Sequence, residues 1–294
     1  MRAIAAGLSD IGRERSHNED RYILLPEFRV YVVADGMGGH QSGEVASRMA
    51  ASTVAGYFRA LKGEGKLSGP DMISREALTE TLKSAVADAN AKIFARADDS
   101  RAHRGMGTTV VAAAFRPEDG TMAVVHAGDS RAYHLRQGTM KQLTRDHSLL
   151  SDALLERPEL TEADLSYLPK NVITRALGIG PTVDLDATFV EAMPGDHFLL
   201  CSDGLHGLID DAMITEILGA CDSLTDCCQR LIEAANKAGG KDNITAVVIR
   251  IEEEAEPWSV RSPGSLPPSR VSQTGLQAVS GPPSSQISRD PTEE

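Results

Sequence analysis

Cysteine is scarce in this sequence, and its few cysteines do not form a recognisable motif. The four are Cys201, Cys221, Cys227 and Cys228, with no CxxC pair and no histidine at zinc-site spacing. This pattern argues against a zinc centre and favours a reduced, cytosolic setting. Cys227 and Cys228 fall within a helical pattern, where we expect them to behave as small buried apolar groups.

Basic residues and long apolar runs are also in short supply. The formal net charge is -12, which argues against a nucleic-acid binder because a phosphate backbone demands a basic face. No stretch approaches the roughly 20 apolar residues of a membrane helix. The N-terminal MRAIAAGLSDIG is too short an apolar run for a signal peptide. We therefore expect a cytoplasmic protein that binds neither nucleic acid nor membrane.

Several chemical motifs are missing as well. No GxxxxGK[ST] string is present and no GxGxxG follows an apolar run, which disfavours ATP or dinucleotide binding. The eight histidines show no HxxxH or HExxH spacing. We expect most of them to be ordinary surface or packing residues.

Short β-branched runs bounded by Gly, Asp and Pro predict strands. They end at Ala34 or lie at 109–115, 122–127, 131–135, 197–201 and 244–251. The strands after residue 105 follow one another too closely for helices between them, so we expect hairpins and antiparallel sheets. Apolar residues spaced by three or four predict helices over 44–61, 75–97 and 223–237. These patterns predict an α+β fold with sheets in the middle and helices outside.

The composition changes abruptly near residue 254. Residues 255–294 are rich in Ser and Pro and show no periodicity, which is typical of a disordered tail. We expect one globular domain over 1–254. The tail is interpreted either as a dispensable extension or as a recruitment or phosphorylation segment.

Acidic residues recur at the ends of the predicted strands. Asp35, Asp129 and Asp203 each follow a strand, and Asp242 with Asn243 precedes the last one. A single aspartate there is usually a turn former or a helix cap. Several acids converging on one end of a sheet would repel one another, and bound cations are the usual remedy. Carboxylate oxygens are hard ligands, which suits Mg²⁺ or Mn²⁺.

A set of short strings occurs in the order typical of one family. The strings are RSHNEDR (15–21), DGMGGH (35–40), GMGTT (105–109), HAGDSRAY (126–133), TRDHS (144–148), TRALG (174–178), CSDGL (201–205) and KDNIT (241–245). With them the chain resembles the protein phosphatase 2C family, in its bacterial branch, from about residue 5 to residue 251. The resemblance implies a four-layer α/β/β/α sandwich in which helices flank two central antiparallel β-sheets.

The resemblance also implies a metal site with two Mn²⁺ or Mg²⁺ ions. Asp35 would bridge both ions, with the Gly36 carbonyl on one of them and with Asp203 and Asp242 on the other. Asp129, together with Asp203, is similar to the ligands of a third, weaker site in the family, and Glu19 would act through metal-bound water. Arg15 matches the arginine that grips the substrate phosphate. Asp20 and Asn243 are motif members that would orient the ligands.

The implied activity is that of a serine/threonine protein phosphatase in signal transduction. Two cations lower the pKa of the water between them, and this water attacks phosphorus directly, without a phosphoenzyme. Many eukaryotic members carry a histidine two residues after the bridging aspartate as a candidate general acid, and this chain has Met37 there. His40 is near in sequence, but the role is not transferred to it. The source of the leaving-group proton stays open.

Partners and rival functions follow from the same resemblance. The implied partners are phosphoserine and phosphothreonine proteins and a bacterial serine/threonine kinase, and we expect a monomer. The segment 149–172 fills the place of the family's mobile flap and is either a substrate-selecting lid or an ordinary surface helix and turn. The rival functions are a catalytically dead module that senses phosphoproteins and a hydrolase acting on small phosphorylated metabolites.

Overall fold

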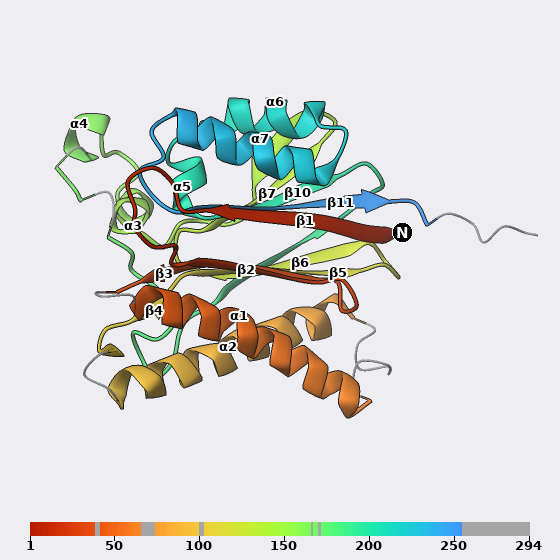
Figure 1. Cartoon of the computed structure of the whole chain (residues 1–294), viewed down its shortest axis with the longest axis horizontal. Coiled ribbons are helices and arrows are strands. Elements are labelled where there is room, and N and C mark those ends of the chain that lie inside the picture. The colour runs from red at the N-terminus through yellow and green to blue at the C-terminus, as the bar shows by residue number, and fades with distance from the viewer. Residues whose placement is uncertain (39–41, 66–73, 100–102, 166, 170–171, 255–294) are drawn as a thin grey trace, which may run out of the picture. The chain divides into compact units, whose positions relative to one another are not determined.

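The computed structural model describes residues 1–38, 42–65, 74–99, 103–165, 167–169 and 172–254. His40 and the predicted disordered tail over 255–294 lie outside these residues. The described part contains two antiparallel sheets, seen edge-on in Figure 1.

The first sheet has the strand order β1-β11-β10-β7-β8. Its strands are β1 (Arg2–Asp10), β7 (Arg131–Arg136), β8 (Thr139–Gln142), β10 (His197–Cys201) and β11 (Ile244–Glu252). The second sheet has the order β2-β3-β5-β6-β9, with β4 paired to β3 beside this path. Its strands are β2 (Asp20–Leu25), β3 (Val30–Met37), β4 (Gly107–Thr108), β5 (Val110–Arg116), β6 (Thr121–Ala127) and β9 (Asp186–Glu191).

Helices cover the outer face of each sheet (Figure 1). The second sheet carries α1 (Ser42–Gly63) and α2 (Arg75–Asp98), and α6 (Asp211–Ala220) and α7 (Leu224–Lys237) lie over the first. Short helices are α3 (Leu149–Glu156), α4 (Glu162–Leu165) and α5 (Asp203–His206). Each predicted strand and each predicted helix is confirmed within a few residues, and so is the four-layer α+β architecture with antiparallel sheets.

Side-chain alternation along single strands explains the four layers. In β3, Val30 and Val32 pack with the helices α1 and α2, whereas Tyr31 and Val33 face the other sheet. Because successive strand residues point to opposite faces, a strand that is apolar at every position is buried on both sides. The uninterrupted apolar run before Asp35 therefore specifies a central strand, with a helix layer on one face and a sheet on the other.

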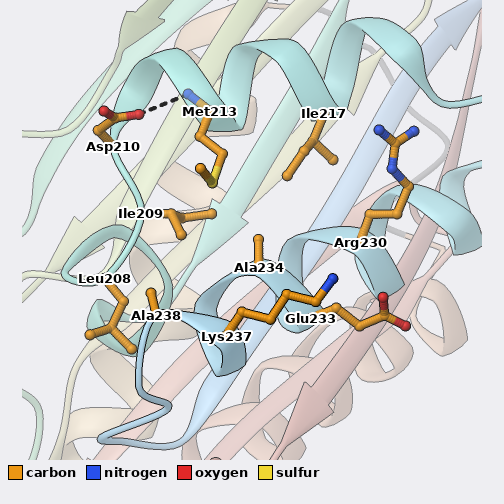
Figure 2. Close-up of a pocket in the computed structure, with 10 residues that line it drawn as sticks. All are labelled: Leu208, Ile209, Asp210, Met213, Ile217, Arg230, Glu233, Ala234, Lys237 and Ala238. Atoms are coloured by element: carbon orange, nitrogen blue, oxygen red, sulfur yellow. Dashed lines mark hydrogen bonds between the residues drawn. The ribbon is translucent and has the colours of Figure 1, made fainter.

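The helices α6 and α7 leave a groove of about 650 Å³ between them (Figure 2). Ile209 and Ile217 form part of its apolar wall, and Arg230 and Lys237 lie along its α7 side. Met213 is 44% exposed there.

The sequence patterns do not predict the strands β1, β2, β8 and β9 or the helix α6, and β1 is the longest of these strands. Its residues RAIAAGLSD are rich in Ala and Gly, which have low strand propensity. Pairing decides its conformation, because Arg2–Asp10 is in register with β11 from Arg2 opposite Glu252 to Asp10 opposite Ile244. A methyl group on Gly7 would stand 2.5 Å from the ring of Tyr22, so Gly7 lets this ring of β2 pack closely against the backbone of β1.

None of the described helices combines the length and the apolar character needed to cross a bilayer.

Asp196, in the turn before β10, forms a buried-carboxylate ion pair with Arg136 of β7 in the first sheet. Its carboxylate is 3% exposed and accepts hydrogen bonds from Arg136 Nε at 2.8 Å and Arg136 Nη2 at 2.6 Å. Burial alone would raise the pKa of Asp196, but Arg136, the Met193 N–H and His134 together lower it. The lowered pKa means that the ionised carboxylate stabilises the fold.

We predict that Asp196→Asn lowers the free energy of unfolding by about 3 kcal/mol at pH 7, because it leaves Arg136 with the Glu191 carbonyl but without its carboxylate partner. An acid whose pKa is lowered on folding stabilises the folded protein at pH values above its pKa in the unfolded chain, which is near 4. This stabilisation is lost as the pH falls through the lower pKa of the folded state. The difference between wild type and variant should therefore shrink below about pH 4, as measured by urea unfolding. Asp88→Asn, which removes the exposed Asp88–Lys92 pair, should cost about 0.5 kcal/mol or less. Equal costs for the two variants would contradict this account.

Candidate metal centre

The predicted acids meet at one end of the two sheets. Asp35 lies near the end of β3, and Asp20 is directly opposite it at the start of β2. Asp129 occupies the turn between β6 and β7, Asp203 is the first residue of α5, and Asp242 lies two residues before the start of β11. The fold thus gathers carboxylates from segments more than two hundred positions apart in the chain.

The pKa shifts of these groups report close mutual repulsion. Burial raises the pKa of Asp35 well above its usual value, and the charges of Asp20, Asp203, Asp129 and Asp242 raise it further. Burial and the charge of Asp203 raise the pKa of Asp129 to about 7. Burial and the charge of Asp242 raise the pKa of Asp203, although a hydrogen bond shared with Asp35 acts in the opposite direction. Such a cluster stays ionised at neutral pH only if cations balance it.

Oxygen atoms without partners identify where cations fit. Among the residues that the structure describes, Asp20 Oδ1, Asp129 Oδ1 and Asp203 Oδ1 are buried and accept no hydrogen bond. A buried carboxylate oxygen without a donor is costly, and a hard cation is the partner that such an all-oxygen set suits. The side chains present therefore fit Mg²⁺ or Mn²⁺.

Hydroxyl groups fix the orientation of Asp20, and sequence reasoning did not single them out. Asp20 Oδ2 accepts hydrogen bonds from Ser202 Oγ and from Thr245 Oγ1, both at 2.7 Å. The Thr245 N–H in turn donates to Ser202 Oγ at 3.0 Å. Burial raises the pKa of Asp20 to about 6, although both hydroxyls stabilise its ionised form. The only sequence signal was indirect, since Ser202 and Thr245 belong to the strings CSDGL and KDNIT.

A second set of hydroxyls holds the backbone of Asp35. Its N–H donates to Thr109 Oγ1 at 3.1 Å, and its carbonyl accepts from Thr108 Oγ1 at 2.8 Å. Thr109 Oγ1 also lies 2.7 Å from Ser130 Oγ, next to Asp129. The string GMGTT therefore acts as a support that places Asp35 relative to Asp129.

Two glycines allow backbone segments to approach within the site. A methyl group on Gly36 would stand 2.1 Å from the carbonyl oxygen of Gly43, so β3 and α1 touch through their main chains. A methyl group on Gly204 would stand 2.1 Å from the carbonyl oxygen of Asn243. Any side chain at either place would force these segments apart.

The remaining predicted residues lie around the carboxylates. Arg15 Nη2 is 2.6 Å from Asp242 Oδ2, and half of its side chain is exposed. Glu19 accepts hydrogen bonds from the N–H groups of Gly43 and Glu44 at the start of α1. Asn243 is buried, accepts from the Glu19 N–H at 2.8 Å and donates to the carbonyls of Ile11 and His17. Asn243 therefore holds together the loop that carries Arg15 and Glu19.

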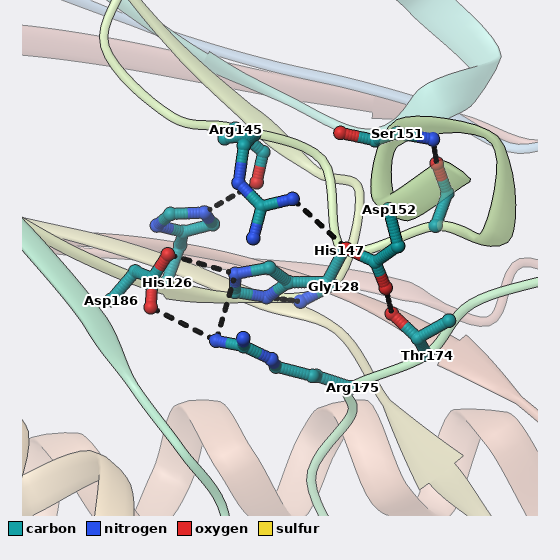
Figure 3. Close-up of polar contacts among 10 residues, drawn as sticks. His126, Gly128, Arg145, His147, Ser151, Asp152, Thr174, Arg175 and Asp186 are labelled. Carbon is teal, nitrogen blue, oxygen red and sulfur yellow. Dashed lines mark hydrogen bonds and ion pairs between the residues drawn. The ribbon is translucent and has the colours of Figure 1, made fainter. Parts of the chain in front are cut away.

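A histidine cluster lies next to the turn that carries Asp129, where the Gly128 N–H donates to His147 Nδ1 at 3.2 Å (Figure 3). Ligand atoms of His126, His147 and Asp186 lie within 4.8 Å of one another. The two imidazole rings are stacked at 12° with their centres 4.6 Å apart. A metal ion lies about 2 Å from a ligating nitrogen, along its in-plane lone pair, so two stacked rings cannot share one ion in this arrangement. Arg175 Nη1 provides the positive charge instead, 2.9 Å from Asp186 Oδ1.

The same cluster fixes the segment that follows α4. The Thr174 N–H donates to the His147 carbonyl at 2.8 Å, and Thr174 Oγ1 donates to Asp152 Oδ2 at 2.7 Å. Arg145 Nη1 also donates to Asp152, at 2.9 Å (Figure 3). Hydrogen bonds therefore hold residues 173–176 against the strand ends, and Asp152 of α3 is hydrogen-bonded to the same residues.

The comparisons with known proteins agree with this geometry. The family model described as protein phosphatase 2C matches residues 11–247. The serine/threonine phosphatase stp of Listeria innocua is 35% identical over 245 residues, which cover 82% of this chain and 93% of that protein. The crystal structure of the Mycobacterium tuberculosis phosphatase PstP/Ppp is 35% identical, with a TM-score of 0.74 over 86% of this chain and 100% of that chain. A structure of the PstP catalytic domain in complex with two manganese ions has a TM-score of 0.69, 34% identity, and coverage of 85% of this chain and 99% of that one.

The repulsion among the carboxylates predicts an unusual pH dependence for the metal-free protein. A carboxyl group whose pKa is raised on folding binds protons more tightly in the folded state, so stability falls as pH rises from about 4 toward the folded value. In chelator, these groups should lower the melting temperature between about pH 4.5 and pH 7, the region where Asp20 and Asp129 titrate. Buried histidines with lowered pKa values, such as His147 and His206, act in the opposite direction in this range, so the quantity to measure is the rise in melting temperature that Mn²⁺ produces at each pH. This rise should grow from pH 4.5 to pH 7, and a rise that is independent of pH would contradict this prediction.

Removing the charge of Asp35 should separate two effects of the cluster, which are the repulsion that destabilises the metal-free protein and the binding of metal ions. We predict that Asp35→Asn stabilises the metal-free protein at pH 7 by about 1 kcal/mol, or about 2–4 °C in melting temperature, because one repelled charge is removed. The same change should abolish most of the stabilisation by Mn²⁺. Asp222→Asn, at an exposed position, is the matched control and should alter neither value. A wild-type response to Mn²⁺ in Asp35→Asn would show that the ions bind elsewhere.

Proposed function

The chain belongs to the protein phosphatase 2C family and is thus a phosphoprotein phosphatase, and from this premise we propose that it hydrolyses phosphoserine and phosphothreonine in proteins at the carboxylate cluster around Asp35. The observation that carries the proposal is the set of buried carboxylate oxygens without partners on Asp129, Asp203 and Asp20. They support metal binding at the place where the family's metal-dependent activity requires it.

We assign two ions to this cluster, with Asp35 as their shared ligand. The Gly36 carbonyl would contact one ion, and Asp203 with Asp242 the other. Glu19 would act through water, and Asp129 with Asp203 would hold a third, weaker ion. The PstP structure with two manganese ions supports this number. When bound, such ions supply a water of lowered pKa and offset the negative charge of the phosphoryl group.

The chain's own residues bind and orient the reactants. Arg15 lies at the open side of the cluster, where its planar guanidinium can donate two hydrogen bonds to phosphate oxygens. Its bond to Asp242 holds the guanidinium in place before substrate arrives. Asp20 receives the hydroxyls of Ser202 and Thr245, which keeps its free oxygen directed at the site. Met37 has no proton to donate, so the proton for the leaving-group oxygen has to come from another group in the site.

The biological setting follows from the relatives. Because they are bacterial serine/threonine phosphatases, we propose that this enzyme reverses the action of a bacterial serine/threonine kinase. The first alternative function, a catalytically dead sensor, is disfavoured by the complete set of acids at the strand ends. The second alternative, a hydrolase for small phosphorylated metabolites, differs from the proposal only in its substrate.

Hydrolysis of a phosphothreonine peptide tests the proposal. Phosphate release should require Mn²⁺ or Mg²⁺, stop with chelator, and fall by about 10³-fold or more in Asp35→Asn. Activity that persists with chelator would overturn the metal mechanism. A folded, metal-binding but inactive wild type would favour the sensor, and cleavage of small phosphorylated metabolites without cleavage of phosphopeptides would favour the metabolite hydrolase.

A substitution at Arg15 tests the phosphate contact. Arg15→Lys keeps the positive charge but loses the planar pair of donors, so we expect kcat/KM for the phosphopeptide to fall by about 10- to 100-fold. Stabilisation by Mn²⁺ should remain within about a degree of wild type, since Arg15 is no metal ligand. Arg48→Lys is the control: Arg48 is an exposed arginine on α1, 3.4 Å from Glu44 one turn away, and the change should leave kcat/KM unchanged. A loss of Mn²⁺ binding in Arg15→Lys would place Arg15 in the metal site instead.

A further inference from the structure

A pocket of about 430 Å³ opens beside the carboxylate cluster. Its apolar wall consists of Met37, Ile173, Ile179 and Val183. Ile179 is 56% exposed, although it is a large aliphatic residue next to the proposed reaction centre.

Met37 places this pocket at a defined distance from the phosphate site. Asp35 and Met37 are two positions apart on β3, so their side chains leave the same face of the strand. Two strand residues span about 7 Å, which is also about the reach of two residues in an extended peptide. A peptide whose phosphorylated residue lies at Asp35 and which runs toward Met37 can therefore reach Met37 with the side chain of a residue one or two positions away.

The pocket is built on fixed backbone. Met37 pairs with Gly107 of β4, and Thr108 of β4 exchanges backbone hydrogen bonds of 2.9 and 3.1 Å with Leu177. A methyl group on Gly107 would stand 2.9 Å from Ile179 Cδ1 and 3.1 Å from Met37 Cε, so these two side chains converge above Gly107. The wall that carries Ile179 is thus connected through β4 to the strand that carries Asp35.

Asn90 of α2 fixes the opposite side of the same loop. Its side-chain oxygen accepts the Gly178 N–H at 2.8 Å, and its nitrogen donates to the carbonyls of Gly180 and Pro181 at 3.1 and 3.2 Å. Asn90 is 1% exposed. A buried side chain that satisfies three backbone groups holds the loop around Ile179 in one conformation, which lowers the entropic cost of binding there.

The charges at the pocket favour an uncharged occupant. Arg175 lines it, but its guanidinium is paired with Asp186 at 2.9 Å. Asp184 is an exposed carboxylate at the rim, which would repel an acidic residue. The lining atoms that remain for contact are mainly the methyl and methylene groups of Met37, Ile173, Ile179 and Val183.

We propose that this pocket is a specificity subsite that takes an aliphatic side chain one or two residues from the phosphorylated residue of the substrate. The proposal rests on the proposed protein phosphatase activity. Within that activity, Met37 and Ile179 are specificity-determining residues that contact the substrate outside the reacting group. In this proposal Met37, which has no acid–base function, contributes to substrate selection by contacting the aliphatic side chain.

The test compares phosphothreonine peptides that differ at a single position. Peptides carry Leu, Ala, Lys or Glu at each of the two positions on either side of the phosphothreonine, and phosphate release gives kcat/KM. For at least one position we expect wild type to prefer Leu over Ala by about tenfold, and to disfavour Glu. Hydrolysis of a small aryl phosphate measures the basal chemistry.

Two variants of opposite size test the pocket itself. Ile179→Ala removes the wall and Ile179→Trp fills the space, and both should reduce the preference for Leu over Ala to within about twofold. Neither should change hydrolysis of the aryl phosphate. Met213→Ala, an exposed aliphatic residue in the groove between α6 and α7 (Figure 2), is the matched control and should keep the wild-type preference. Thermal melting checks that each variant is folded.

The outcomes separate the subsite from the activity on which it rests. Equal rates for Leu and Ala peptides in wild type, or a preference that survives both Ile179 variants, would overturn the subsite while leaving the phosphatase intact. A preference for Lys over Leu would show that Asp184 governs the pocket, which also overturns an aliphatic subsite. Cleavage of the aryl phosphate but of no phosphopeptide would refute the protein phosphatase proposal, and the subsite with it.

Discussion

The carboxylate of Asp20 and the two hydroxyls bound to it hold the functional end of this molecule together. Asp20 belongs to β2 in one sheet, whereas Thr245 belongs to β11 in the other and Ser202 directly follows β10 of that sheet. Asp20 is also opposite Asp35 in the strand register. Because Ser202 directly precedes Asp203, the same contact that joins the sheets brings Asp203 to Asp35.

The carboxylate cluster and the apolar sandwich make opposite demands on stability. The sheets and helices bury apolar side chains in three clusters, which stabilise the chain. At the strand ends the same burial raises the pKa values of Asp35, Asp129 and Asp203 and so opposes ionisation. The carboxylate cluster therefore lowers the stability of the metal-free fold, and the apolar core offsets this cost. The same repulsion among the carboxylates gives the site its affinity for the cations that the chemistry requires.

Sequence patterns predict the elements whose own apolar periodicity identifies them without knowledge of their neighbours in the fold. The strand ending at Ala34 is a continuous apolar run, the strand over 244–251 is rich in β-branched residues, and 223–237 has clear helical spacing, so each is recognisable alone. Strand β1 is not, because only its register with β11 makes RAIAAGLSD extended. The acids at the strand ends were likewise visible, but their supports Thr109, Ser202 and Thr245 were not. A hydroxyl group acts over a few ångströms, and which acid it reaches is decided by tertiary contacts that no local pattern encodes.

The pairing of β1 with β11 has a consequence for when the enzyme becomes active during its synthesis. β11 is the last strand of the described domain, and it lies between β1 and β10. Until it leaves the ribosome, β1 lacks its partner, Asp20 lacks Thr245, and the loop with Arg15 lacks Asn243. Contacts of such long sequence separation form late in folding. A nascent chain therefore carries most of the acids but no assembled site, so dephosphorylation begins only with the completed domain.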